Sequence, residues 1–193
     1  MPAKKSLAML FSSALLLGSS QLMAAGPSAT LLGDTCAGCH GTDGASAGPA
    51  TPSIAGMSAE YFKDVMKQYQ EDDRKSTIMG RIAKGYTDAE IALMGDHFAG
   101  KPIHMAKQNL DADKVAAGSK LYKKNCGKCH DEFGGLADDD SGILAGQWLP
   151  YMMYSMEDFK AGHREMPKKM KKKVKKLDDF DIEALLTFFA SQQ

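Results

Sequence analysis

All four cysteines of this chain lie in two five-residue motifs of the form Cys-x-x-Cys-His. The motifs are Cys36-Ala-Gly-Cys39-His40 and Cys126-Gly-Lys-Cys129-His130. Two thiols separated by two residues and followed directly by an imidazole are the pattern by which a protein binds a c-type heme covalently. Each motif therefore predicts two thioether bonds to one heme, with His40 or His130 as the proximal ligand of its iron.

Three other chemistries also use paired cysteines: a zinc site, a thioredoxin-like redox pair and a disulfide within each loop. Disulfides would suit an exported chain. However, the two pairs lie far apart in the chain, each is followed by histidine, and no βαβ pattern surrounds either pair. Because the two motifs use every cysteine in the chain, the sequence favours two covalently bound hemes c and no free thiol.

The N-terminus, residues 1–25, has the features of a secretory signal peptide. Two lysines form a short basic start, residues 7–17 are apolar, and small residues lead up to Ala24 and Ala25. The apolar stretch is well short of the roughly 20 residues that span a bilayer. We therefore expect cleavage after Ala24 or Ala25, a periplasmic mature chain, and no membrane span after cleavage.

The overall charge points to no particular partner, but one segment is strongly basic. The chain has 24 basic and 24 acidic residues, and removing the two signal-peptide lysines leaves it close to neutral, which gives no argument for a nucleic acid partner. In contrast, residues 168–176 contain seven lysines. Two interpretations stay open: these lysines attract an acidic partner, or they form a solvated helix face balanced by Asp178, Asp179 and Asp181.

A comparison of the chain with itself, anchored on the two motif histidines, shows an internal repeat. Ile54-Ala-Gly and Leu144-Ala-Gly follow their histidines at the same interval, and Tyr61 and Tyr151 correspond in the same way. The last segments also match if the second copy has one extra residue. A unit of about ninety residues therefore occurs twice. We expect a first domain at residues 26–104, a second at residues 105–193, and a linker formed by residues 100–113.

Each copy is predicted to be all-α. Residues 115–124, 151–160 and 182–190 place apolar side chains at helical spacing, and no stretch alternates as a strand does. The glycine-rich residues 41–52 and 131–142 are predicted to form loops around the edge of each heme. A domain of under about 90 residues is small enough to depend on its heme as part of the core.

The sixth ligand of each iron decides whether the heme carries electrons or binds a small molecule, and a methionine thioether favours the first. Most of the 13 methionines suit core packing. Met79 lies just before a predicted helix of the first copy and is predicted to bind the first iron. Met170 follows His130 at the interval from His40 to Met79, plus the one position that the repeat requires, and is predicted to bind the second iron. Met166 lies slightly closer to His130 in the chain and is the alternative ligand of the second iron.

The remaining histidines, His97, His104 and His163, are rivals for the sixth position, but none recurs in both copies. The ring nitrogen of a proximal histidine that does not bind iron usually donates a hydrogen bond to a nearby acceptor. For His40 we expect that acceptor to be the carbonyl of Pro49. The second copy has no proline in the corresponding loop, so the acceptor for His130 stays open.

These residues resemble tandem two-domain cytochromes c, and more closely the diheme cytochrome subunits of flavocytochrome c sulfide dehydrogenases. The broader resemblance rests on the two heme motifs and the Ala-Gly that follows each. The closer one covers the whole mature chain and rests on Ser76-Thr-Ile-Met-Gly-Arg-Ile-Ala-Lys-Gly-Tyr86, Ile143-Leu-Ala-Gly-Gln-Trp148, Pro150-Tyr151, Asp158-Phe159 and the final Ala-Ser-Gln-Gln. The resemblance implies an all-α fold of two cytochrome c-like domains, each built around one covalently bound heme.

The resemblance also implies a function: a periplasmic electron-transfer subunit, not catalytic alone, in a heterodimer with a sulfide-oxidising flavoprotein. It would accept electrons from the flavin and pass them to a soluble acceptor cytochrome. FAD is expected on the partner subunit only, because this chain has no dinucleotide-binding glycine fingerprint. The alternatives are a free-standing diheme carrier that serves a terminal oxidase, and a diheme peroxidase, which a candidate methionine for each iron disfavours.

Overall fold

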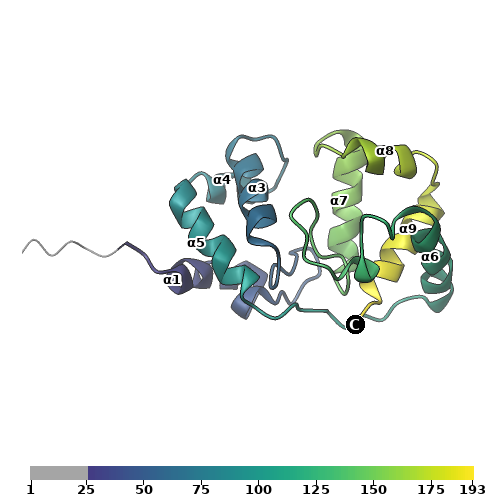
Figure 1. Cartoon of the computed structure of the whole chain (residues 1–193), viewed down its shortest axis with the longest axis horizontal. Coiled ribbons are helices and arrows are strands. Elements are labelled where there is room, and N and C mark those ends of the chain that lie inside the picture. The colour runs from purple at the N-terminus through teal and green to yellow at the C-terminus, as the bar shows by residue number, and fades with distance from the viewer. Residues whose placement is uncertain (1–25) are drawn as a thin grey trace, which may run out of the picture.

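The computed structural model describes residues 26–193, and in that part of the chain the regular structure is entirely helical. The predicted signal peptide, residues 1–25, lies outside the described residues. Figure 1 shows the helices of the first half grouped on one side of the molecule and those of the second half on the other. The all-α prediction is confirmed. None of the helices within residues 26–193 combines the length and the apolar character needed to cross a bilayer.

The two halves repeat a similar order of helices, except that α2 of the first half has no helical counterpart in the second. The first half contains α1 (Ala29–Asp34), α2 (Ala37–His40), η1 (Thr42–Gly44), α3 (Ala59–Gln70), α4 (Met79–Ala83) and α5 (Asp88–Ala99). The second half contains α6 (Ala112–Asn125), η2 (Glu132–Gly134), α7 (Leu149–Ala161), α8 (Lys168–Val174) and α9 (Asp179–Ala190). The three helices predicted in the second half fall inside α6, α7 and α9, and each predicted loop contains a short 3-10 turn.

Side-chain caps fix where several of these helices begin. Asp111 accepts hydrogen bonds from the backbone N–H groups of Asp113 and Lys114 at the start of α6. Thr87 and Glu90 form a reciprocal capping box at the start of α5. Such caps satisfy N–H groups that have no partner within the helix. The linker between the halves therefore ends at Asp111, two residues earlier than predicted.

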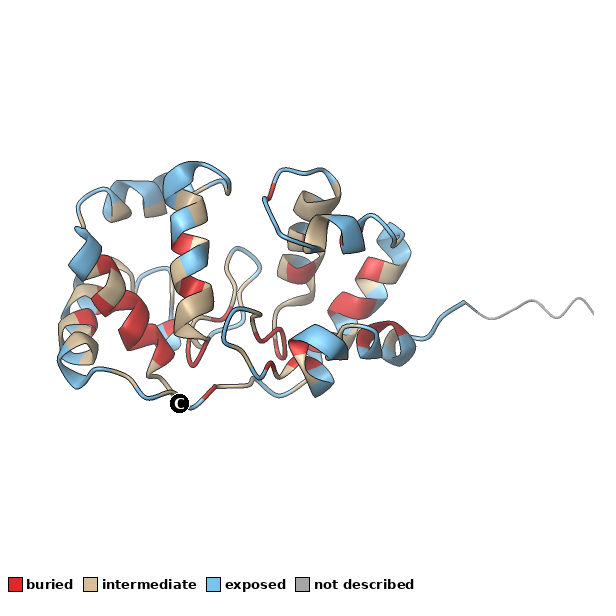
Figure 2. Ribbon diagram, turned by 180° about the vertical axis from the view of Figure 1, so that it is seen from behind, coloured by how far each residue is buried: buried red, intermediate tan, exposed pale blue. Residues whose placement is uncertain are grey.

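Each half has its own apolar core. The first core contains Leu32, Ile54, Phe62, Met66, Ala83, Ile91, Met94 and Phe98. The second contains Tyr122, Met152, Met156, Ile182, Leu185, Leu186, Phe188, Phe189 and Ala190. Figure 2 shows these buried residues on the inner faces of the helices, with exposed residues covering the outer faces. The methionines in both cores agree with the expectation that most methionines of the chain serve packing.

The segment that joins α5 to α6 packs against the second half. The backbone N–H of Ala106 donates to the carbonyl of Gly146 over 2.8 Å. The side chain of Gln108 donates to the carbonyl of Gln147 over 3.0 Å and accepts from the N–H of Leu149 over 2.9 Å. These bonds hold an extended segment in place along the start of α7.

A network of side chains joins the loop after α2 to the start of α7. Gln147 is 5% exposed, and its amide accepts from the N–H of Ser53 over 3.0 Å and donates to the carbonyl of Ser53 over 2.9 Å. The indole Nε1 of Trp148 donates to the carbonyl of Ser46 over 3.0 Å. The same indole covers Gly48, where φ is +63° and a Cβ atom would overlap the ring. The two halves are therefore joined by directional contacts as well as by the chain.

Two arginines, at equivalent positions of the two copies, lie close to Tyr61 of the first half. Arg164 donates to the hydroxyl of Tyr61 over 3.0 Å and lies 4.1 Å from the ring centre of Phe159. Arg74 is buried and lies 5.2 Å from the ring centre of Tyr69. Burial alone would raise the pKa of Tyr61, but the positive charges of Arg164 and Arg74 lower it overall.

Candidate heme sites

The first motif is organised by the single turn of α2. Cys36 is the residue at its N-terminal end, and the N–H of His40 donates to the carbonyl of Cys36 over 2.9 Å. Gly41 follows with φ +76°, a value that glycine adopts without strain, and turns the chain out of the helix. This turn keeps both thiols and the imidazole within one short segment, as covalent heme attachment requires.

The ring of His40 is held by Pro52 and not by Pro49, so the predicted acceptor was wrong. The Nδ1–H group of His40 donates to the carbonyl of Pro52 over 2.8 Å. Pro49 follows Gly48, which packs under Trp148 of the second half. That part of the loop is therefore engaged at the contact between the halves, and the chain returns to the histidine three residues later.

This hydrogen bond determines which nitrogen of His40 is available for a metal. A carbonyl oxygen can only accept, so Nδ1 carries the proton and Nε2 keeps its lone pair. The ring is 9% exposed, and burial lowers the pKa of His40, although the bond to Pro52 opposes this effect. The imidazole is therefore neutral near pH 7, which is the form that binds iron.

The second motif follows the last turn of α6. Cys126 ends that helix, and the N–H of His130 donates to the carbonyl of Cys126 over 3.0 Å. The hydroxyl of Tyr122 donates to the carbonyl of His130 over 2.8 Å and accepts from the N–H of Phe133 over 3.1 Å. A buried tyrosine on α6 thus positions the backbone on both sides of the proximal histidine.

The Nδ1 atom of His130 is buried and has no hydrogen-bond partner among the residues that the structure describes. Gly142 holds the position equivalent to Pro52, and it lies against the ring of Tyr61 in the first half. Burial lowers the pKa of His130, while the charge of Asp138 acts in the opposite direction. The imidazole is again neutral, but its ring lacks the carbonyl acceptor that orients His40.

The four thiols are unbridged and differ from those of reactive cysteine pairs. Burial raises the pKa of Cys36, and it raises that of Cys126 to about 11. Neither thiol therefore has the lowered pKa that is typical of a redox-active cysteine. Within residues 26–193, no three His, Cys, Asp or Glu side chains form a metal-binding group. The two cysteine pairs thus lie in separate sites.

The residues present fit one heme c at each motif. Each site offers two unbridged thiols and a neutral imidazole. Cys36 packs against the first apolar core, as Met79 and Tyr86 do. Cys126 packs against the second core, as Met170 and Val174 do. An apolar wall beside the cysteines suits the porphyrin ring, which becomes part of the core of each small domain.

The structure brings each predicted methionine to the core that its cysteine pair contacts. Met79 is the first residue of α4, and Met170 lies within α8. Met166 also packs against the second core, so it remains a rival of Met170. The assignment of Met79 and Met170 as iron ligands stays a prediction.

The other histidines have different surroundings. His97 lies over Gly33 where α5 meets α1, and its ring meets that of Phe98 edge to face with centres 5.1 Å apart. His163 lies 3.2 Å from the ammonium group of Lys75. These contacts agree with packing and surface roles for His97 and His163.

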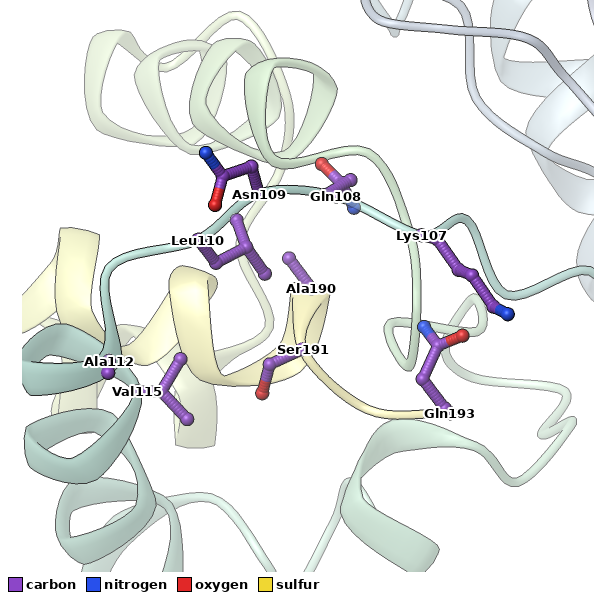
Figure 3. A pocket seen from close by; sticks show the side chains of 9 residues that line it. All are labelled: Lys107, Gln108, Asn109, Leu110, Ala112, Val115, Ala190, Ser191 and Gln193. Atoms are coloured by element: carbon purple, nitrogen blue, oxygen red, sulfur yellow. The ribbon is translucent and has the colours of Figure 1, made fainter.

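A surface pocket lies apart from both motifs, between the linker and the C-terminal end of α9 (Figure 3). None of the motif cysteines or histidines, and neither predicted methionine, lines it. Its lining includes Lys107, Gln108, Leu110, Val115, Ser191 and Gln193.

The chain matches two family models, one in each half. Residues 26–97 match the model described as Cytochrome c, and residues 113–189 match the model described as Cytochrome C oxidase, cbb3-type, subunit III.

Two curated proteins and one solved structure show how far the similarity extends. The cytochrome subunit of sulfide dehydrogenase from Chlorobaculum tepidum is 44% identical over 79 residues, which cover 41% of this chain and 67% of that protein. Cytochrome c4 from Pseudomonas aeruginosa is 29% identical over 167 residues, covering 79% of this chain and 81% of that protein. The crystal structure of cytochrome c4 from Pseudomonas stutzeri superposes with a TM-score of 0.74 at 23% identity, over 88% of this chain and 100% of that chain.

Proposed function

Because this chain belongs to the cytochrome c family and carries two of its domains in tandem, we propose that it is the diheme electron-transfer subunit of a periplasmic, sulfide-oxidising flavoprotein complex. The predicted fold of two cytochrome c domains is confirmed. The two cysteine–histidine motifs imply two hemes c, so the chain is a diheme electron-transfer cytochrome. In the proposed complex it accepts electrons from the FAD of its partner and passes them to a soluble cytochrome.

The observation that carries this proposal is the same set of candidate donors in both halves. In the proposed arrangement, His40 and Met79 would hold the first iron, and His130 and Met170 would hold the second. Heme c supplies a reversible one-electron change at its iron. Two protein ligands on each iron would leave no open position for a substrate. The apolar cores beside Cys36 and Cys126 would pack against the porphyrin rings. This arrangement supports electron transfer rather than catalysis on a bound substrate.

The identity of the electron donor is supported by sequence similarity. The cytochrome subunit of sulfide dehydrogenase from Chlorobaculum tepidum, which is 44% identical over 79 residues, is a similar protein whose name includes a donor reaction. The segments around Met79 and Trp148 carry the closer resemblance to such subunits. In the proposed complex, the flavoprotein partner carries the sulfide-oxidising site.

Purification of the protein from its native host, without a tag on a candidate partner, tests this proposal. We expect a flavin-containing chain to purify with a cytochrome whose intact mass includes two covalent hemes. Sulfide should reduce both hemes in the complex, whereas the isolated cytochrome mixed with sulfide serves as the control and should react far more slowly.

Two results would contradict the proposal in different ways. A mass with fewer than two hemes, after expression with the heme-attachment machinery, would exclude the diheme assignment. A diheme protein that purifies without a flavoprotein and exchanges electrons directly with a terminal oxidase would favour the free-standing carrier.

A further inference from the structure

We propose that one cationic surface at the second heme site docks an acidic electron-transfer protein. We call it the lysine face, and it consists of the seven lysines of residues 168–176 together with Lys123, Lys124 and Lys128. The proposal rests on the proposed function of the chain as an electron carrier, and it adds the chemistry of the protein that docks at the second site.

Helix α8 is anchored by one apolar stripe, which leaves its lysines in solvent. Met170, Val174 and Leu177 recur at helical spacing and pack against the second core. All seven lysines of residues 168–176 are exposed. Figure 2 shows α8 without a buried residue, in contrast to α9. The helix therefore holds a dense group of ammonium groups in a fixed place.

The nearby aspartates form no ion pair with these lysines. Asp179 forms an ion pair with Lys160, with 2.6 Å between Nζ and Oδ1. Asp178 accepts from the N–H of Asp181 over 2.8 Å as the N-cap of α9. Within residues 26–193, none of the seven lysines of residues 168–176 forms an ion pair. The seven lysines are therefore exposed and form no direct pair with their acidic neighbours.

The lysines also act against the stability of α8 itself. Lys168 and Lys169 lie in its first turn, where the free N–H groups of a helix disfavour positive charge. Lys168 and Lys172 are four residues apart, as are Lys169 and Lys173, and like charges at this spacing repel each other. Local helix stability therefore does not explain this composition, whereas a negatively charged partner does.

The lysine face lies beside the second pair of motif cysteines. Met170 and Val174 of α8 pack against the same apolar core as Cys126. Lys123 and Lys124 precede Cys126, and Lys128 lies inside the motif; all three are exposed. A partner that binds this surface would lie beside the second site, which matters because the rate of electron transfer falls steeply with distance.

The equivalent surface of the first half has a different character. Helix α4 contains one basic residue, Arg81, and Lys84 at its end is paired with Asp72 over 2.6 Å. Ile78 and Ile82 are exposed beside Met79. The lysine face therefore belongs to one site only, which gives the two ends of the molecule different partners.

The charge pattern favours an acidic protein over a membrane. A helix that lies on a bilayer inserts an apolar face below its charged face. The apolar residues of α8 are already packed against the second core, so this helix has none to insert. A protein with clustered carboxylates needs only the charges, which steer its approach and orientation.

Electron transfer to plastocyanin, an acidic blue-copper protein, provides the test. The reduced diheme protein is oxidised by plastocyanin in stopped flow at low and at high ionic strength. A face variant neutralises three lysines: Lys172→Gln, Lys173→Gln and Lys176→Gln. A matched control loses the same charge in the first half: Lys63→Gln, Lys67→Gln and Lys84→Gln. Benzoquinone, an uncharged oxidant, is used in parallel with each protein.

At low ionic strength we expect the face variant to react with plastocyanin about tenfold more slowly than the parent, and the control less than about twofold more slowly. The parent rate should fall steeply with added salt, and rates with benzoquinone should be equal for all three proteins. Equal slowing by both variants, or a parent rate that does not depend on salt, would overturn the proposal.

Further outcomes separate a failure of the docking proposal from a failure of the proposed electron-carrier function. If the protein fails to cycle with benzoquinone, the proposed electron-carrier function itself is wrong. If cycling is normal but the face variant matches the parent with plastocyanin, only the docking proposal fails. Sedimentation of the parent, but not the face variant, with phosphatidylserine vesicles would then assign the lysine face to a membrane surface.

Discussion

At the scale of single residues, the two proximal histidines are the most informative pair in the molecule. They follow identical motifs, yet the Nδ1 of His40 donates to Pro52 over 2.8 Å and the Nδ1 of His130 has no partner among the described residues. A hydrogen bond at this nitrogen increases the basicity of the nitrogen that binds metal. The two sites therefore differ although their motifs are the same.

We expect the first heme to have the lower reduction potential, because a more basic imidazole stabilises the oxidised iron. Redox titration of two single-heme variants would measure this: C126A/C129A keeps the first heme, and C36A/C39A keeps the second. The positive charges of the lysines near the second site would also raise the potential of the second heme. The titration is therefore done at high salt, which screens these charges. Equal potentials at high salt, or the reverse order, would show that the bond to Pro52 does not control the difference.

A second prediction at this scale concerns the methionine that binds the second iron. Met170→Ala should abolish the methionine–iron absorption band of one heme and lower its potential, because a thioether favours reduced iron. Met166→Ala is the matched control, since both residues pack against the same core. The ligand assignment would move to Met166 if only the control variant lost the band.

At the scale of helices, the contact between α6 and α9 positions the second site. Gly118 of α6 lies against the backbone of Ala184 and the side chain of Phe188 in α9, so a Cβ atom at residue 118 would overlap both. Tyr122, one turn later on α6, then reaches the backbone of His130. The close approach of two helices thus determines where the motif histidine lies.

Gly118→Ala should destabilise the heme-loaded protein by about 2 kcal/mol, because the new methyl group meets backbone atoms that cannot move aside locally. Thermal unfolding followed by heme absorption measures the loss. Gly100→Ala is the control, because the nearest atoms to a Cβ there are 3.6 Å away and φ is −78°. A similar midpoint for both variants would mean that the two helices do not need glycine to approach each other.

At the scale of the whole molecule, the two halves are joined by a buried amide as well as by the linker. Gln147 makes two hydrogen bonds to the backbone of Ser53, and Trp148 makes one to that of Ser46. Both bonded residues lie in or beside the loop that reaches His40. The position of the two heme sites relative to each other therefore depends on residues that also shape the first heme site.

Gln147→Ala should loosen the contact between the halves at a cost of about 1–3 kcal/mol, because the N–H and carbonyl of Ser53 lose their partners in a buried place. We expect faster proteolysis between α5 and α6 while both hemes stay bound. Gln70→Ala is the control. The side chain of Gln70 also makes two hydrogen bonds to the backbone, donating to the carbonyls of Ala83 and Tyr86, but both lie within the first half. Equal proteolysis of the two variants would contradict a role for Gln147 between the halves.

Much of this protein follows from local sequence. Covalent heme attachment requires residues that are neighbours in the chain, so Cys36, Cys39 and His40 and their second copy are visible without a structure. Helical periodicity is also local, which is why α6, α7 and α9 agree with the predicted ranges. The offset between copies also selected Met79 and Met170, which pack against the first and the second core, and their ligation stays a prediction.

Only the tertiary structure decided which groups meet across long stretches of chain. Pro52 replaced Pro49 as the acceptor for His40, because Gly48 is held under Trp148 from the other half. Asp179, close in the chain to the lysines of residues 168–176, forms its ion pair with Lys160 of α7 instead. Hydrogen bonds and ion pairs form between groups that folding brings together, and the spacing of residues along the chain carries no information about such distant partners.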